Sequence, residues 1–119
     1  MRMMFAHDAV IEIADDGDVG APGASITAAV CGTLHHEGPC PLAPHHTSAQ
    51  IEGSQTLLRI LFATEPDDEG QVRELIAAAL NSGQYPEPDG TVVHWQVISS
   101  QASPVKPSEL VHAARLVAT

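Results

Sequence analysis

Aromatic residues are scarce in this chain of 119 residues: one tryptophan, one tyrosine and two phenylalanines make up 3% of it. A hydrophobic core must therefore be built mainly from valine, isoleucine, leucine and alanine. The total hydrophobic content of 44% is close to that of ordinary globular proteins. Because a chain of this length can bury such a core, we expect a single domain over residues 1–119.

Basic residues are also few. Five lysines and arginines stand against 15 aspartates and glutamates, which gives a net charge of −10. An electronegative surface repels the phosphates of nucleic acids and of anionic membranes, so we expect neither as a partner. Such a surface favours solubility, cations or a basic protein partner.

Long apolar segments are missing as well. No run approaches the roughly 20 apolar residues of a membrane-spanning helix. Asp8 and Glu12 interrupt the only early segment that could resemble the core of a signal peptide. These features predict a cytoplasmic protein, where the chain's two cysteines would more often serve as thiols or ligands than as a permanent disulfide.

Hydrophobic patterning predicts four β-strands. Residues alternate between apolar and polar, or between two apolar faces, over 8–14, 25–31 and 91–98. The segment 55–63 is apolar on both sides except at Arg59, which is typical of a central strand covered on both faces.

Two helices complete the expected fold. Apolar residues at positions 72, 75, 76, 79 and 80 form one helical stripe, and Gly83 follows as a stop signal. A second stripe from Leu110 to Val117 predicts a last helix after Pro107. The order β-β-loop-β-α-β-α predicts an α+β fold, with a four-stranded sheet and two helices packed on one face.

The expected loop over residues 32–49 is rich in histidine, cysteine and proline. Six side chains that ligate soft or borderline metals fall between positions 31 and 46: Cys31, His35, His36, Cys40, His45 and His46. Sulfur and imidazole donors in a proline-stiffened loop suit a tetrahedral zinc ion, although copper(I) and nickel also accept them. Because adjacent side chains diverge, we expect both cysteines to bind together with one histidine of each pair.

The spacing of these donors matches neither the common zinc-finger pattern nor the HExxH motif of metalloproteases. Only their local density supports a metal site. Two alternatives therefore stay open: a disulfide between Cys31 and Cys40, or independent thiols with solvent-facing imidazoles.

Sequence signatures of catalysis are missing. The glycines of "GDVGAPG" lack the strand, helix and lysine of a phosphate-binding loop, and no cysteine-enzyme signature surrounds Cys40. We therefore favour an accessory or regulatory protein over the third alternative, an enzyme that uses Cys40 or a catalytic zinc ion. The accessory protein would bind a metal ion, first of all zinc, through the Cys/His-rich loop and contact a protein partner or a second copy. The alternative is a metal-free interaction module or a subunit of a larger complex.

Three further side chains have expected positions. Trp95 lies among valines in the predicted strand 91–98, so we expect it in the core. His7 and His112 lie near the two ends of the chain, and we expect both at the surface.

Overall fold

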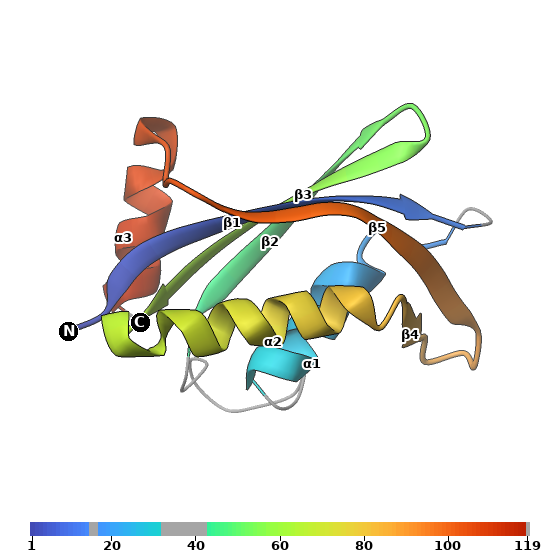
Figure 1. Ribbon diagram of the computed structural model, residues 1–119, viewed down its shortest axis with the longest axis horizontal. Helices are drawn as coiled ribbons and strands as arrows, with labels where there is room; N and C mark the ends of the chain where they lie inside the picture. The colour runs from blue at the N-terminus through green and yellow to red at the C-terminus, as the bar shows by residue number, and fades with distance from the viewer. Residues whose placement is uncertain (15–16, 32–42, 119) are drawn as a thin grey trace.

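The computed structural model describes residues 1–14, 17–31 and 43–118, which form five β-strands and three α-helices (Figure 1). In chain order these are β1 (Met3–Ile13), α1 (Ala21–Cys31), β2 (His45–Glu52), β3 (Gln55–Thr64), α2 (Glu69–Asn81), β4 (Gln84–Pro86), β5 (Val92–Ser103) and α3 (Leu110–Ala118). Short 3-10 turns, η1 (Pro66–Asp68) and η2 (Pro107–Glu109), lead into α2 and α3. No helix in this part of the chain is long and apolar enough to cross a membrane.

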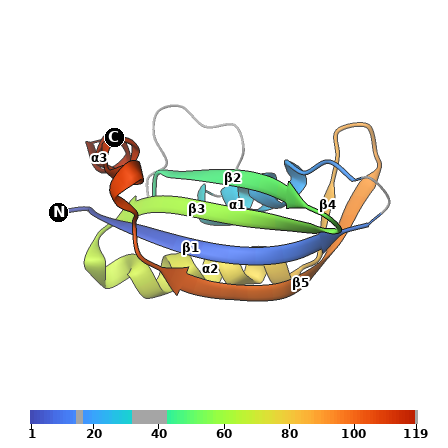
Figure 2. The same cartoon turned by 90° about the horizontal axis from the view of Figure 1, so that it is seen from above.

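The strands form one antiparallel sheet in the order β2-β3-β1-β5-β4. The connection β1-α1-β2 skips over β3, and β3-α2-β5 skips over β1, so each helix joins two strands that are not neighbours. Both α1 and α2 cover the same face of the sheet (Figure 2). This is the split β-α-β arrangement of ferredoxin-like folds, with β4 and α3 added.

The hydrophobic core lies between the sheet and the helices α1 and α2. Alternate residues of β1 and β3 point into it, since successive strand residues face opposite sides. Its fully buried side chains include Ile11, Ile26, Ile60, Phe62, Ile76 and Leu80. Trp95 is 6% exposed, and its indole N–H donates to the carbonyl oxygen of Leu80 at 2.8 Å. The expected core position of Trp95 is thereby confirmed.

The α+β class is confirmed, but the sheet has five strands rather than four, and three helices occur rather than two. The segment 25–31 was predicted as a strand and is the second half of α1. Ile26 and Val30, both buried, are two strand periods apart but also one helical turn apart, so a short pattern fits either structure. The surrounding alanines favour the helix.

The predicted loop over residues 32–49 is also wrong at its end, because residues 45–49 belong to β2. β2 lies at the edge of the sheet, and its side chains are mostly polar. The alternation of apolar and polar residues that would predict a strand is therefore missing from its sequence. The other predicted elements are confirmed with shifted bounds. Gly83 ends α2 with φ +68°, and a Cβ there would lie 3.0 Å from the carbonyl oxygen of Trp95.

Candidate functional site

Two of the expected metal ligands meet where α1 ends and β2 begins. Cys31 is the last residue of α1 and His45 the first of β2. The fold brings the Sγ atom of Cys31 to 3.9 Å from Nδ1 of His45, and both residues are partly buried. The sulfur of Cys31 is disulfide-bonded, and the rest of that bond lies outside the described residues. The structure thus records Cys31 in its oxidised form.

The imidazole of His45 has a hydrogen-bond partner at each nitrogen. Nδ1 lies 3.0 Å from the carbonyl oxygen of Ala43, which can only accept, so Nδ1 carries a proton there. Nε2 lies 2.9 Å from Oγ1 of Thr27, whose hydroxyl is also 3.1 Å from the carbonyl oxygen of Gly23. A metal ion bound at Nδ1 would therefore displace a proton and the contact with Ala43.

The neighbouring histidine faces the other way. Because successive strand residues alternate, His46 projects from the opposite face of β2. Its ring contacts that of His112 on α3, with centroids 4.7 Å apart and planes inclined by 58°. A single ion held at His45 is thus out of reach of His46 in this arrangement.

The other predicted ligands, His35, His36 and Cys40, lie outside the described residues. Among the residues that the structure describes, no three histidine, cysteine, aspartate or glutamate side chains gather closely enough to hold a metal ion. What the described residues contribute to the expected site is therefore the pair of Cys31 and His45.

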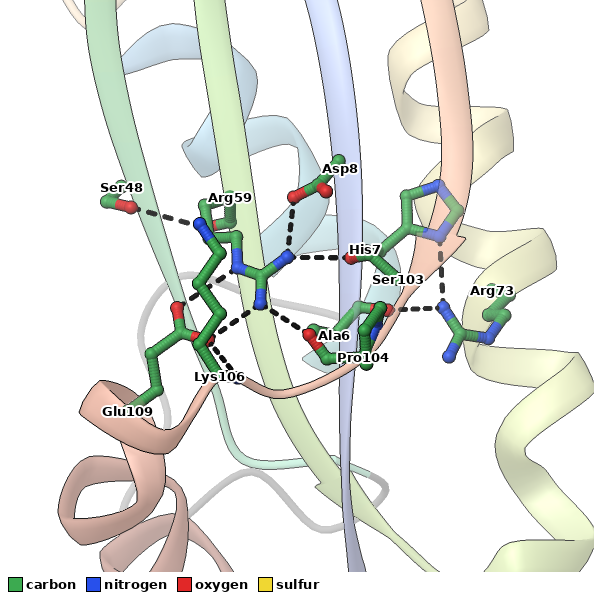
Figure 3. Close-up of polar contacts among 10 residues, drawn as sticks. All are labelled: Ala6, His7, Asp8, Ser48, Arg59, Arg73, Ser103, Pro104, Lys106 and Glu109. Atoms are coloured by element: carbon green, nitrogen blue, oxygen red, sulfur yellow. Dashed lines mark hydrogen bonds and ion pairs between the residues drawn. The ribbon is translucent and has the colours of Figure 1, made fainter.

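The densest polar cluster surrounds Arg59, in the middle of β3. Its guanidinium donates from Nε and Nη2 to the two carboxylate oxygens of Glu109, at 3.0 and 2.6 Å (Figure 3). Nη1 donates to Asp8 at 2.8 Å and to Ser103 at 2.7 Å, and Nη2 also donates to the carbonyl oxygen of Pro104 at 2.7 Å. All five N–H groups are thereby used. Arg59 thus fixes the segment that precedes α3 against the sheet. Its guanidinium has no N–H group left to donate to an anionic ligand.

Sequence reasoning missed this cluster. The one available signal was the lone charge at Arg59 in an otherwise apolar strand, because a half-buried arginine needs acceptors around it. The acceptors themselves come from residues 44 to 51 positions away. The hydrogen bonds that Glu109 accepts from Arg59 lower the pKa of Glu109 to about 2. The carboxylates of Glu109 and Asp8 in turn raise the pKa of Arg59.

This shift predicts an acid-dependent loss of stability. The pKa of Glu109 is lower in the folded protein than its usual 4.5, so its contribution is complete above pH 4.5 and disappears as the pH falls to about 2. We expect the Glu109→Gln variant to be less stable than the wild type by about 2 kcal/mol at pH 5, since the pair borders solvent, and the difference to shrink toward pH 2. Urea unfolding at several pH values measures it.

The exposed Glu74 on α2 offers a matched control for this titration. The Glu74→Gln variant should stay within about 0.5 kcal/mol of the wild type across the same pH range. A stability difference for Glu109→Gln that does not change between pH 5 and pH 2 would contradict the assignment.

His7 was expected at the surface, and this expectation is wrong: its exposed fraction is 6%. The strand β1 begins at Met3, earlier than predicted, so His7 lies inside the strand and opposite Ile60. Burial, and then the charge of Arg73, lower its pKa. His112, in contrast, is partly buried against His46.

The contacts of His7 also bear on catalysis. Nδ1 lies 3.1 Å from Nη1 of Arg73, and a guanidinium can only donate, so Nδ1 is unprotonated (Figure 3). Nε2 therefore carries the proton and donates to Oγ of Ser100 at 2.8 Å. A general base would need the reverse, with a free Nε2 lone pair facing the serine. The pair of His7 and Ser100 is accordingly structural.

Surface hollows of about 590 Å³ occur elsewhere on the molecule. One lies on the sheet face that α1 and α2 leave open, and its lining includes Asp8, Ser48, Gln50, Arg59 and Lys106. Another lies beside β4, and its lining includes Asp18, Glu87, Asp89 and His94. Neither is lined by the pair of Cys31 and His45, so the pair does not border either ligand-sized hollow.

No protein-family model matches this chain, and a comparison with curated proteins finds no significant match. The chemistry of the chain's own residues therefore carries the functional inference.

Proposed function

We propose that this protein binds a divalent metal ion, first of all zinc, through the reduced thiolate of Cys31 and the imidazole of His45. Further donors come from the His/Cys/Pro-rich segment between them. The observation that supports this is the distance of 3.9 Å between Sγ and Nδ1. A tetrahedral zinc ion with ordinary bond lengths holds sulfur and nitrogen about 3.6 Å apart, so a small side-chain rotation is enough.

The oxidation state of Cys31 controls the proposed site. A disulfide sulfur lacks the thiolate charge that zinc needs. A dithiol reductant supplies two electrons and two protons, which open the S–S bond and leave two thiols, and zinc then displaces the thiol protons. The protein would bind the ion under reducing conditions and release it on oxidation. This is an accessory or regulatory role and involves no catalytic step.

Zinc analysis of the reduced protein tests the proposal. We expect untagged protein, purified without oxygen in the presence of a dithiol, to carry about one zinc ion per chain, and a chelator to lower its Tm. The Cys31→Ser and His45→Ala variants should each bind zinc more weakly by roughly two orders of magnitude or more, because each loses a direct ligand. Elemental analysis and competition with a zinc-binding dye measure both effects.

The adjacent histidine provides the control for this experiment. His46 lies on the opposite face of β2, so the His46→Ala variant should keep the tightly bound zinc ion of the reduced protein. A reduced wild type without zinc and with a Tm unchanged by chelation would contradict the proposal. Equal losses of zinc affinity in the His45→Ala and His46→Ala variants would also contradict the proposal, because only His45 lies beside Cys31.

A metal-free interaction module is the second candidate, and the exposed edge of the sheet favours it. β2 is an outer strand, and its last five side chains are all exposed, among them Ile51 at 64%. Such an edge can accept a strand from a partner or from a second copy. Sedimentation of the metal-free protein distinguishes the two candidates, because this one requires association without any ion.

A further inference from the structure

The second conspicuous feature of β2 is the ring pair that it forms with the C-terminal helix. His46 is exposed on the sheet face opposite to α1 and α2, and the partly buried His112 comes from α3. Their ring centroids are 4.7 Å apart, although the two residues are far apart in the sequence. The tertiary structure thus places two imidazoles together on a solvent-accessible surface.

We infer that His46 and His112 form a second, separate binding site for a divalent transition-metal ion. Imidazole nitrogens suit copper(II), nickel(II) and zinc. An ion bound to an imidazole nitrogen lies about 3.2 Å from the ring centroid, given a metal–nitrogen bond of about 2.0–2.1 Å. When each ring turns one nitrogen toward a shared ion, two centroids 4.7 Å apart subtend an angle of about 95° at that ion, near the right angle that copper(II) and nickel(II) prefer.

The remaining coordination positions belong to water. Within the described part of the chain, no third histidine, cysteine, aspartate or glutamate joins a group with these two. The site is therefore of the weak, exchangeable kind. Its ion would cross-link β2 to α3, beside the clamp that Arg59 and Glu109 make at the start of the helix.

This site is independent of the one proposed at Cys31. It uses no sulfur, and His45 points to the other side of the strand. The oxidised protein, in which Cys31 is disulfide-bonded, should therefore bind an ion at His46 and His112 while the thiolate site is closed. Working with oxidised protein separates the failure of one proposal from the failure of the other.

Copper(II) chloride titrated into the oxidised, untagged, ¹⁵N-labelled full chain tests the inference. We expect substoichiometric copper to broaden the amide signals of β2 and α3 around His46 and His112 first. The His46→Ala and His112→Ala variants should each bind copper at least about tenfold more weakly by calorimetry, since one imidazole remains. His46 is exposed, so its replacement leaves the fold intact even if the His112 variant is destabilised.

The variant His94→Ala, at an exposed residue of β5, is the control and should bind copper at His46 and His112 within about twofold of the wild type. Broadening centred on other residues would overturn the inference. Equal copper affinity in the wild type and in His46→Ala would overturn it as well.

Discussion

Replacement of Arg59 by methionine is expected to lower the free energy of unfolding by about 3 kcal/mol. The side chains of Arg59 and Glu109 are only 15% and 18% exposed, so the change leaves a nearly buried carboxylate without its partner. Asp8 and Ser103 lose a donor at the same time. Breaking a fully buried pair costs about 3–5 kcal/mol, and the value here falls at the lower end because Asp8 borders solvent.

The loss should concentrate in the C-terminal helix. Arg59 is the anchor for the start of α3, so hydrogen exchange in α3 should become faster than in α2. The Arg59→Lys variant should recover only part of the stability, because an ammonium cannot make the two parallel bonds to Glu109. Replacement of the exposed Gln50 by methionine on the same sheet face should change stability by less than about 0.5 kcal/mol. Equal effects at positions 59 and 50 would refute the role of the cluster.

Replacement of Phe62 by alanine is expected to lower the free energy of unfolding by about 3–5 kcal/mol. Phe62 is 1% exposed and stacks on Phe5 with ring centroids 5.4 Å apart. The guanidinium of Arg73 lies 5.1 Å from its ring centroid. The substitution removes these contacts and opens a cavity between β3 and α2, in a core that has few other aromatic rings.

The effect of Phe62→Ala should also reach the proposed zinc site. Phe62 pairs with His45 across β2 and β3, so a loosened core would weaken the position of His45 against Cys31. Denaturant unfolding measures the stability, and zinc affinity in the reduced protein measures the coupling. Replacement of the exposed Ile51 by alanine is the control and should cost less than about 0.5 kcal/mol. A Phe62→Ala variant as stable as the Ile51→Ala variant would show that the core is not built around this ring.

Local patterns predicted those elements whose periodicity is unambiguous. The apolar stripe of α2 spans more than two turns, and the continuous apolar run of β3 is too short for a buried helix, so each was assigned correctly. The segment 25–31 was not, because Ile26 and Val30 fit both periods. The edge strand β2 was missed because its exposed side chains carry no apolar alternation.

The candidate site divides in the same way. The sequence identified a segment rich in histidine and cysteine. The general rule that adjacent side chains diverge then predicted that His45 and His46 would not bind the same ion. The sequence could not tell that a strand begins at His45, which is the reason why this residue faces Cys31 while His46 faces His112. Nor could it find the acceptors of Arg59, since nothing local links positions so far apart.

The amino-acid sequence by itself thus determined the acidic surface, the aliphatic core, the α+β class and the set of available donor atoms. These properties depend on composition and on neighbours within about one helical turn. Only the tertiary structure decided which donors meet, because antiparallel pairing and helix packing join residues by their register in space. Cys31 with His45, His46 with His112, and Arg59 with Glu109 are all contacts of this second kind.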